Sequence, residues 1–187
     1  MKTIAVVAVQ GAFIEHEKIF QQLGCKTIQL RQASDLCKNF DALVLPGGES
    51  TVQGKLLREL GMFDTLKQQI VDGLPVFATC AGAILLAKTV ANDQCCHFRT
   101  LDITINRNGY GRQLSSFYHV GEFGDITGVP MSFIRAPRIT DVGKDVTVLS
   151  RCNGEVTAVR ANTQWAMTFH PELSADIRCH ELFWQNI

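Results

Sequence analysis

Hydrophobic and polar residues follow different patterns in the two halves of the chain. In the first half, short apolar runs alternate with stretches whose apolar residues recur at helical spacing. The predicted strands of this half are Thr3 to Val9, Lys26 to Leu30, Asp41 to Leu45 and Pro75 to Thr79. The predicted helices follow Gly11, Ser50 and Cys80, and the last of them spans Ala81 to Lys88. Alternating strands and helices indicate a parallel sheet that is covered by helices.

The second half consists of closely spaced strands with glycine and asparagine turns between them. Asn153-Gly154 is the clearest hairpin turn, because both residues tolerate positive φ. The predicted strands are Leu101 to Ile105, Ser115 to Val120, Met131 to Ile134, Val146 to Ser150, Glu155 to Ala161 and Trp165 to Phe169. Ser174 is expected to cap a final helix. We therefore expect an α/β fold with an open, mostly parallel sheet, helices on both faces and an antiparallel extension.

Composition narrows the class of protein. The 187 residues predict a single domain spanning residues 1–187. Hydrophobic residues make up 46% and charged residues 19%, which excludes a disordered chain. The 18 basic and 18 acidic residues cancel, so charge gives no reason to expect nucleic acid as a partner.

Neither the apolar runs nor the cysteines of the chain indicate a membrane protein or a disulfide-bonded one. No apolar run approaches the ~18 residues of a membrane span, so no membrane association is expected. The seven cysteines are odd in number and show no disulfide framework. This favours a reducing, cytoplasmic compartment.

Cys80 is the strongest candidate for a nucleophile. It lies between a predicted strand and a predicted helix, and the residues two before and two after it, Ala78 and Gly82, are small. A nucleophile on a sharp strand-to-helix turn needs small residues there and presents its side chain at the end of the sheet. Backbone N–H groups at the helix start would also favour a thiolate. The alternative is a buried cysteine at a strand end.

A thiol nucleophile needs a base and a group that orients the base. His170 directly follows a predicted strand, and Glu172 is two residues further on. In an extended segment residues i and i+2 point to the same side, so the carboxylate could hold the imidazole, and Pro171 would stiffen the spacing. A lone His-x-Glu is more typical of a solvated pair. The presence of Cys80 at another strand end favours catalysis, because the carboxyl ends of parallel strands form one crevice.

A glycine loop ends a third predicted strand. Gly47 and Gly48 could let backbone N–H groups approach a ligand and stabilise an oxyanion. Ser50 with Gln53 would form a capping box for the following helix. The alternative is an ordinary glycine turn, and the phosphate-loop pattern is absent.

Other motifs have simpler interpretations. Cys95-Cys96-His97 has no partner pair at zinc-site spacing, so no metal site is expected. Glu15-His16-Glu17 is interpreted as the solvated face of a helix. Arginine suits carboxylate recognition, but surface placement is the default for Arg107, Arg112, Arg135 and Arg138.

Several of these motifs together resemble the signature of the class I, triad-type glutamine amidotransferases. The resemblance is closest to the branch of glutaminase subunits of pyridoxal 5′-phosphate synthase. The matching segments are Gln10-Gly11-Ala12 with Glu15-His16, Pro46 to Thr51, Thr79 to Gly82, Arg107-Asn108 with Gly111-Arg112-Gln113, Phe133 to Pro137 and Phe169 to Glu172. They occur in the right order over nearly the whole chain, which makes the match more specific than any single motif.

The resemblance implies a flavodoxin-like fold that hydrolyses L-glutamine to L-glutamate and ammonia without a cofactor. It implies Cys80 as nucleophile, His170 as base and Glu172 as the group that orients the base. The implied oxyanion hole combines the backbone N–H of Ala81 with one from the Gly47-Gly48 segment. The implied glutamine site comprises Gly47, Gly48, Glu49, Arg107, Ile134 and Arg135. The family usually has glycine where this chain has Ala78, which would tighten the turn.

The resemblance also implies a partner, a synthase subunit that uses the ammonia to make pyridoxal 5′-phosphate in a hetero-oligomer. Alternatives remain open. The protein could be another cysteine-dependent amidase or peptidase of the same superfamily. It could also be a non-catalytic module that keeps the fold, or a flavodoxin-type carrier, although no cofactor fingerprint is present.

Overall fold

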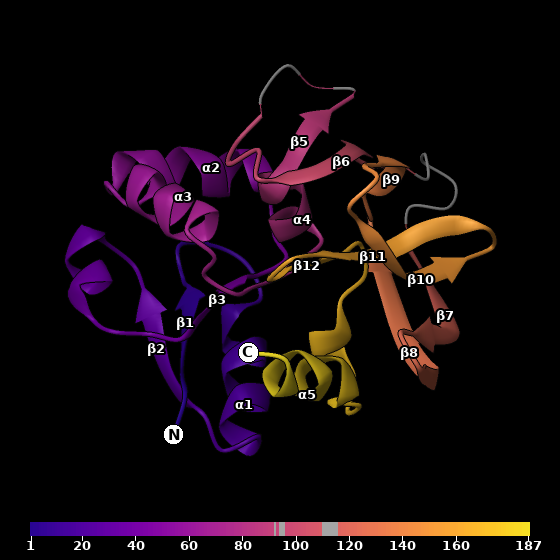
Figure 1. Ribbon diagram of the computed structural model, residues 1–187, viewed down its shortest axis with the longest axis horizontal. Coiled ribbons are helices and arrows are strands. Elements are labelled where there is room, and N and C mark those ends of the chain that lie inside the picture. The colour runs from indigo at the N-terminus through magenta and orange to yellow at the C-terminus, as the bar shows by residue number, and fades with distance from the viewer. Residues whose placement is uncertain (92, 94–95, 110–115) are drawn as a thin grey trace.

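The computed structural model describes residues 1–91, 93, 96–109 and 116–187. Within these residues ten strands form one mixed sheet, and a separate hairpin lies beside it (Figure 1). The order in the sheet is β2-β1-β3-β4-β12-β11-β9-β6-β5, with β10 paired to β11. The strands of the sheet are β1 (Thr3–Val7), β2 (Lys26–Leu30), β3 (Ala42–Leu45), β4 (Val76–Thr79), β5 (Ala87–Val90), β6 (Leu101–Asn106), β9 (Arg138–Val142), β10 (Thr147–Cys152), β11 (Glu155–Ala161) and β12 (Gln164–Met167).

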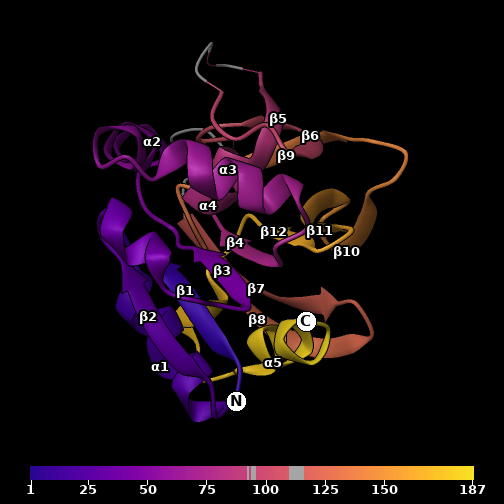
Figure 2. The ribbon, with the colours of Figure 1, turned by 60° about the vertical axis from the view of Figure 1, so that its left-hand side comes forward.

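Helices cover both faces of the parallel part of the sheet, which runs from β2 to β12. The helices are α1 (Phe13–Gln22), α2 (Ser50–Glu59), α3 (Phe63–Val71), α4 (Ala81–Leu86) and α5 (Arg178–Gln185). Figure 2 shows α1 and α5 on one side of these strands and α2, α3 and α4 on the other. The predicted α/β architecture with a mostly parallel core and an antiparallel extension is confirmed.

Two hydrophobic cores explain why the first strands are apolar throughout. In β1, Ile4 and Val6 pack into the core that includes Phe20 of α1. Ala5 and Val7 point the other way, into the core that includes Leu57 of α2 and Leu66 of α3. Successive side chains of a strand face opposite sides of the sheet, so a strand between two helical layers must be apolar at every position.

Hairpins dominate the second half. Asn153 and Gly154 both have positive φ, and they connect the antiparallel pair β10 and β11 as predicted. The separate hairpin consists of β7 (Ser116–Phe123) and β8 (Ile126–Ile134). It packs Met131 and Phe133 into the same core as α1 and α5, and so closes that side of the sheet.

Several local predictions are wrong. α3 was not predicted, although its buried Phe63, Leu66 and Ile70 recur at helical spacing. α4 ends at Leu86, and β5 follows directly; β9 was also missed. The final helix begins at Arg178 without a side-chain cap. The Oγ atom of Ser174 instead accepts a hydrogen bond from the N–H of Asp176 before the helix starts.

The predicted capping box at α2 does not form. The N-cap of α2 is Glu49, and no side chain caps it. Gln53 instead donates from Nε2 to the backbone carbonyls of Gln10 (3.0 Å) and Pro46 (3.1 Å). Its side chain therefore ties the loop after β1 to the loop after β3.

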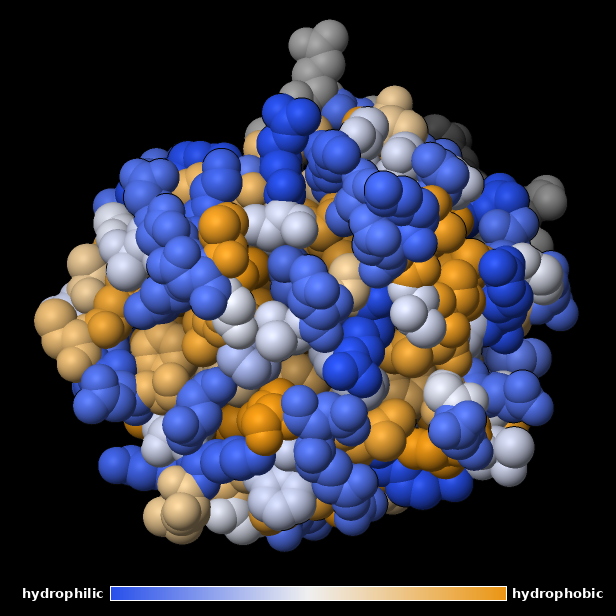
Figure 3. Space-filling model, viewed as in Figure 1, coloured by the Kyte–Doolittle hydropathy of each residue, from blue (hydrophilic) through white to orange (hydrophobic). Residues whose placement is uncertain are grey.

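The surface shows no single dominant feature on the face that Figure 3 displays, where hydrophobic residues lie in groups between hydrophilic ones. Such mixing is ordinary for a folded protein, because apolar atoms make up much of any protein surface. In the described part of the chain, none of the helices has both the length and the hydropathy needed to cross a membrane. The six cysteines in that part are all free.

Candidate active site

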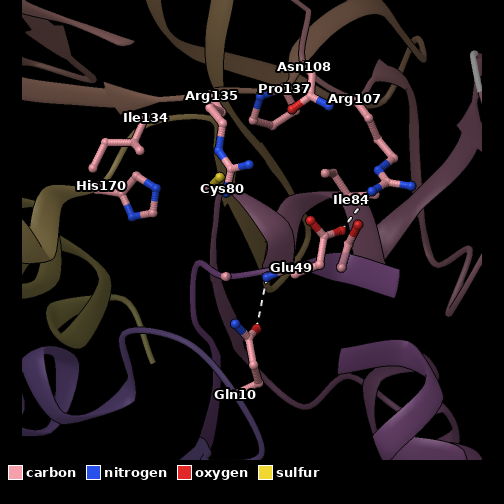
Figure 4. A pocket seen from close by; sticks show the side chains of 12 residues that line it. Gln10, Glu49, Cys80, Ile84, Arg107, Asn108, Ile134, Arg135, Pro137 and His170 are labelled. Atoms are coloured by element: carbon pink, nitrogen blue, oxygen red, sulfur yellow. Dashed lines mark hydrogen bonds and ion pairs between the residues drawn. The ribbon is translucent and has the colours of Figure 1, made fainter. Parts of the chain in front are cut away.

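One pocket collects the segments that follow four neighbouring parallel strands. Gln10 follows β1, Glu49 follows β3, Cys80 follows β4 and His170 follows β12 (Figure 4). These strands are adjacent in the order β1-β3-β4-β12. The cavity has a volume of about 210 Å³. The carboxyl ends of the parallel strands thus form the crevice that the sequence predicted.

Cys80 occupies a strained turn between β4 and α4. Its backbone has φ 47° and ψ −101°, a conformation that is unfavourable for a residue with a side chain and is typical of a nucleophile elbow. A Cβ atom on Gly82 would lie 2.1 Å from the carbonyl oxygen of Leu45, so only glycine fits there. Ala78 is completely buried in β4. Gly82 therefore has the steric role that the sequence predicted, and Ala78 occupies a site without access to solvent.

His170 and Glu172 form a buried pair. His170 Nδ1 lies 2.7 Å from Glu172 Oε1, and the two residues are 7% and 5% exposed. The segment from His170 to Glu172 was predicted to be extended, but it is not. Pro171 begins a short 3-10 helix (Pro171–Leu173), and this turn brings the side chains together.

Electrostatics in the pocket stabilise an ion pair. Burial disfavours a charged His170, but hydrogen bonds with Cys80 and Glu172 outweigh it and raise the pKa of His170 well above 6.5. Burial would likewise raise the pKa of Glu172, yet His16 and His170 hold it below its ordinary value. The arrangement therefore favours an ionised Glu172 beside a protonated His170, which is the cation that a Cys80 thiolate needs.

The glycine loop approaches the histidine closely. A Cβ atom on Gly47 would lie 2.3 Å from His170 Cε1, so the absence of a side chain is required. The Gly47 carbonyl accepts a hydrogen bond from the N–H of Ala12 at 3.0 Å. The N–H of Gly48 points the opposite way, because the peptide between the two glycines is trans. The N–H of Glu49 donates to Gln10 Oε1 at 2.8 Å, which fixes the loop further.

Opposite charges meet at the mouth of the pocket. Arg107 Nη2 lies 2.7 Å from Glu49 Oε1, and Arg107 Nη1 lies 2.7 Å from Asp93 Oδ2. Thr51 also donates to Glu49. The family resemblance implied that Arg107 and Glu49 share one site, and the structure brings them together. Asp93 was not predicted, because nothing in its local sequence links it to Arg107.

The sequence profile of the SNO glutamine amidotransferase family matches residues 6–187. The chain belongs to this family. A pyridoxal 5′-phosphate synthase subunit PdxT from Desulfitobacterium hafniense is 55% identical over 98% of this chain and 92% of that protein. The protein of the same name from Methanocorpusculum labreanum is 48% identical over 98% of this chain and 97% of its own length.

Solved structures agree with the assignment to the amidotransferase family. A crystal structure described as a glutamine amidotransferase is 38% identical, has a TM-score of 0.92 and covers 97% of both chains. A glutamine amidotransferase from Thermotoga maritima is only 16% identical, with a TM-score of 0.63 over 99% of this chain and 83% of that one, and shows the fold alone.

Most of the predicted site residues line the pocket, but Gly47, Ala81 and Glu172 do not, and several further residues do. Ile134 and Arg135 do so as expected, and Arg135 has a positive φ of 43° that turns the chain at the end of β8. The lining residues that sequence reasoning did not assign to the site are Gln10, Ser50, Ile84, Asn108 and Pro137. All of these except Ile84 belong to segments that the family resemblance did single out.

The structure contradicts the interpretation of His16 and covers only part of two motifs that the sequence singled out. His16 is not on a solvated face: it is completely buried and lies behind Glu172. Within the described residues, no group of three or more potential ligands could hold a metal ion. Cys95 and the Gly111-Arg112-Gln113 motif lie outside those residues.

Proposed function

We propose that this amidotransferase hydrolyses L-glutamine to L-glutamate and ammonia through Cys80, His170 and Glu172. The observation that carries the proposal is that His170 lines one pocket with a cysteine on a strained elbow and is held from behind by the buried Glu172, 2.7 Å away. A nucleophile, its base and the group that orients the base are the minimum set for acyl transfer through a covalent intermediate. We propose that residues 1–187 form a single domain.

The first half of the reaction forms a thioester. The Cys80 thiolate attacks the side-chain amide carbon of glutamine, and the carbonyl oxygen becomes an oxyanion. His170 then gives its proton to the departing nitrogen, the C–N bond breaks and ammonia leaves. Glu172 keeps the imidazole in the orientation and tautomer that these transfers need.

The second half regenerates the enzyme. His170, now neutral, takes a proton from water, and the resulting hydroxide attacks the thioester carbonyl. The C–S bond breaks, glutamate leaves, and Cys80 returns as a thiolate beside protonated His170. Both steps pass through an oxyanion. The N–H of Ala81, which has no intrahelical partner at the start of α4, is proposed to stabilise it together with the N–H of Gly48.

The charged mouth of the pocket suits a zwitterionic amino acid. Glu49 offers a carboxylate for the α-ammonium group, and Arg107 offers a guanidinium for the α-carboxylate. Gly47, Gly48, Ile134 and Arg135 are proposed to complete the glutamine site. Glu49 and Arg107 pair with each other, so each is already placed to bind one charged group of the amino acid.

Ammonia released at neutral pH is protonated unless a second protein takes it up directly. We propose that the protein supplies ammonia to a pyridoxal 5′-phosphate synthase as one subunit of a cytoplasmic hetero-oligomer. The support is the name of relatives that match nearly the whole chain at 48–55% identity. Another cysteine-dependent amidase or peptidase is the alternative, and the paired charges at the pocket mouth favour the amino acid.

The test is glutamate release with and without the synthase subunit. Cys80→Ala should abolish release and leave the unfolding temperature unchanged, whereas Cys37→Ala, at an exposed free cysteine, should be fully active. The synthase should co-elute with the protein and draw its ammonia from glutamine. Substantial glutamate release by Cys80→Ala would refute the nucleophile, and turnover of peptides but not of glutamine would refute the substrate.

A further inference from the structure

His16 lies completely buried on α1, behind the carboxylate of Glu172. Its Nε2 atom is 3.6 Å from Glu172 Oε2 and 3.2 Å from Thr79 Oγ1. Its Nδ1 atom is 2.9 Å from Nε2 of His180, a residue of α5 that is also completely buried. The mechanism above uses neither histidine. Two polar rings in a hydrophobic core need a physical reason.

Glu172 is the group that this pair can serve. Its Oε1 atom accepts a hydrogen bond from His170, whereas its Oε2 atom has no hydrogen-bond partner within the described residues. Burying an ionised carboxylate is costly unless opposite charges or hydrogen-bond donors compensate the lost water. His170 compensates one oxygen, and His16 is placed to compensate the other.

The direction of the hydrogen bond between the histidines follows from electrostatics. Burial lowers the pKa of both His16 and His180, so both rings are neutral and each carries one N–H. If His16 donated from Nδ1, the lone pair of its Nε2 would face the Glu172 carboxylate, which is repulsive. If His180 donates from Nε2, the Nε2–H of His16 faces Thr79 and Glu172 instead. When His180 donates from Nε2, its Nδ1 atom carries no proton. Nδ1 has no hydrogen-bond partner, so this arrangement leaves no buried N–H unpaired.

We propose that His16 is a positioning residue for the reaction assigned above, that its Nε2–H supports Oε2 of Glu172, and that His180 sets the tautomer of His16. The inference rests on the proposed function, since it extends the Cys80, His170 and Glu172 set inward. Near neutral pH the lowered pKa leaves the His16 ring mainly neutral, so it offers an N–H dipole; the charge that it gains when protonated acts on Glu172 in the same direction. The dipole keeps Glu172 ionised and aimed at His170, and so keeps His170 protonated beside Cys80.

Other titratable or charged groups face this cluster from the surrounding elements. Glu15 and Lys18 of α1 border the same surface hollow as Glu172. The turn after β4 contributes Cys80, the residue before the short 3-10 helix is His170, and α5 contributes His180. All of them remain in place when His16 alone is replaced, so differences between variants of His16 report on its own N–H.

Two variants of similar size separate positioning from packing. His16→Gln retains an N–H donor near the position of Nε2, whereas His16→Met fills the same space without one. The readout is the titration of the His170 ring, followed by histidine NMR on the full chain and assigned with a His170→Gln sample. It needs neither glutamine nor turnover, so its outcome is separate from that of the glutaminase assay.

The expected result is a lower titration point for His170 in His16→Met, by about one pH unit or more, which is a tenfold change in proton affinity. His16→Gln should stay within a few tenths of a unit of the native protein. In the complex with the synthase, His16→Met should lower kcat about tenfold with KM unchanged, and His16→Gln should recover most of it. Equal titration in His16→Met, His16→Gln and the native protein would overturn the proposal.

A milder variant covers the case in which His16→Met does not fold. His180 lies among aromatic rings, with centroids 5.3 Å from Phe20 and 4.7 Å from Phe77, so His180→Phe should be accommodated. It removes only the donor that sets the tautomer of His16. The titration point of His170 should then fall between those of the native protein and His16→Met, or below the native value if His16→Met is not obtained. An unchanged titration point in His180→Phe would refute the role assigned to His180.

Discussion

His170 Nδ1 lies 2.7 Å from Glu172 Oε1, and both residues are buried. A short hydrogen bond to a buried carboxylate fixes the orientation of the imidazole. It also keeps a proton on Nδ1 in both the neutral and the protonated ring. The other ring nitrogen is then free to exchange a proton with Cys80. This one contact links the 3-10 turn after β12 to the elbow after β4, and the chemistry of the pocket depends on it.

Replacing the carboxylate of Glu172 by an amide should impair catalysis more than folding. Glu172→Gln preserves the shape but removes the charge that orients and stabilises protonated His170. We expect kcat for glutamate release to fall by between about 100- and 10,000-fold, as for the equivalent change in other triads. Asp176→Asn is the control, since its carboxylate pairs with Arg178. A loss below tenfold in Glu172→Gln would show that Glu172 has no orienting role.

The close approach of the glycine loop to the histidine can be tested with one methyl group. In Gly47→Ala the added Cβ would lie 2.3 Å from His170 Cε1, so the ring or the loop must move. We expect glutamate release to fall at least tenfold. Gly73→Ala is the control: its Cβ meets nothing within 4 Å, but its φ is 101°. It should lose about 1 kcal/mol of unfolding free energy and retain activity.

The paired charges at the pocket mouth should control affinity for glutamine. Arg107→Met removes a charge-assisted hydrogen bond to the α-carboxylate, worth about 1.5–3 kcal/mol. We therefore expect KM to rise by about 10- to 100-fold, measured by steady-state glutamate release. Arg151→Met should leave KM unchanged, because Arg151 bonds only the carbonyl of Gly154 among the partners described. An unchanged KM in Arg107→Met would exclude Arg107 from the glutamine site.

The raised pKa of His170 predicts how stability depends on pH. A group that binds its proton more tightly in the folded state adds stability that is fully present below its unfolded pKa of about 6.5. That stability is lost as the pH rises through the raised pKa of the folded state. The difference in unfolding free energy between the native protein and His170→Gln should therefore shrink above pH 6.5. Urea unfolding at several pH values measures it, and a difference that grows with pH would contradict the ion pair.

Sequence patterns were sufficient for the parallel core and for the residues at its strand ends. The runs at β1 and β3 are apolar at every position because helices cover both of their faces. Cys80 and His170 were recognised because each directly follows such a strand. The helix α3 was missed even though its apolar spacing is regular, and the role of Gln53 was mistaken because a local capping motif competes with a contact to distant loops.

The amino-acid sequence by itself determined the alternation of strands and helices, the small residues around Cys80 and the family to which the chain belongs. These features depend on short-range periodicity and on motifs with constant spacing. Only the tertiary structure decided that His16 lies behind Glu172 and that Arg107 pairs with Glu49 and Asp93. Such contacts join residues far apart in the chain. Whether a polar helix residue faces water or a buried carboxylate depends on which elements pack against it, and local composition does not encode that choice.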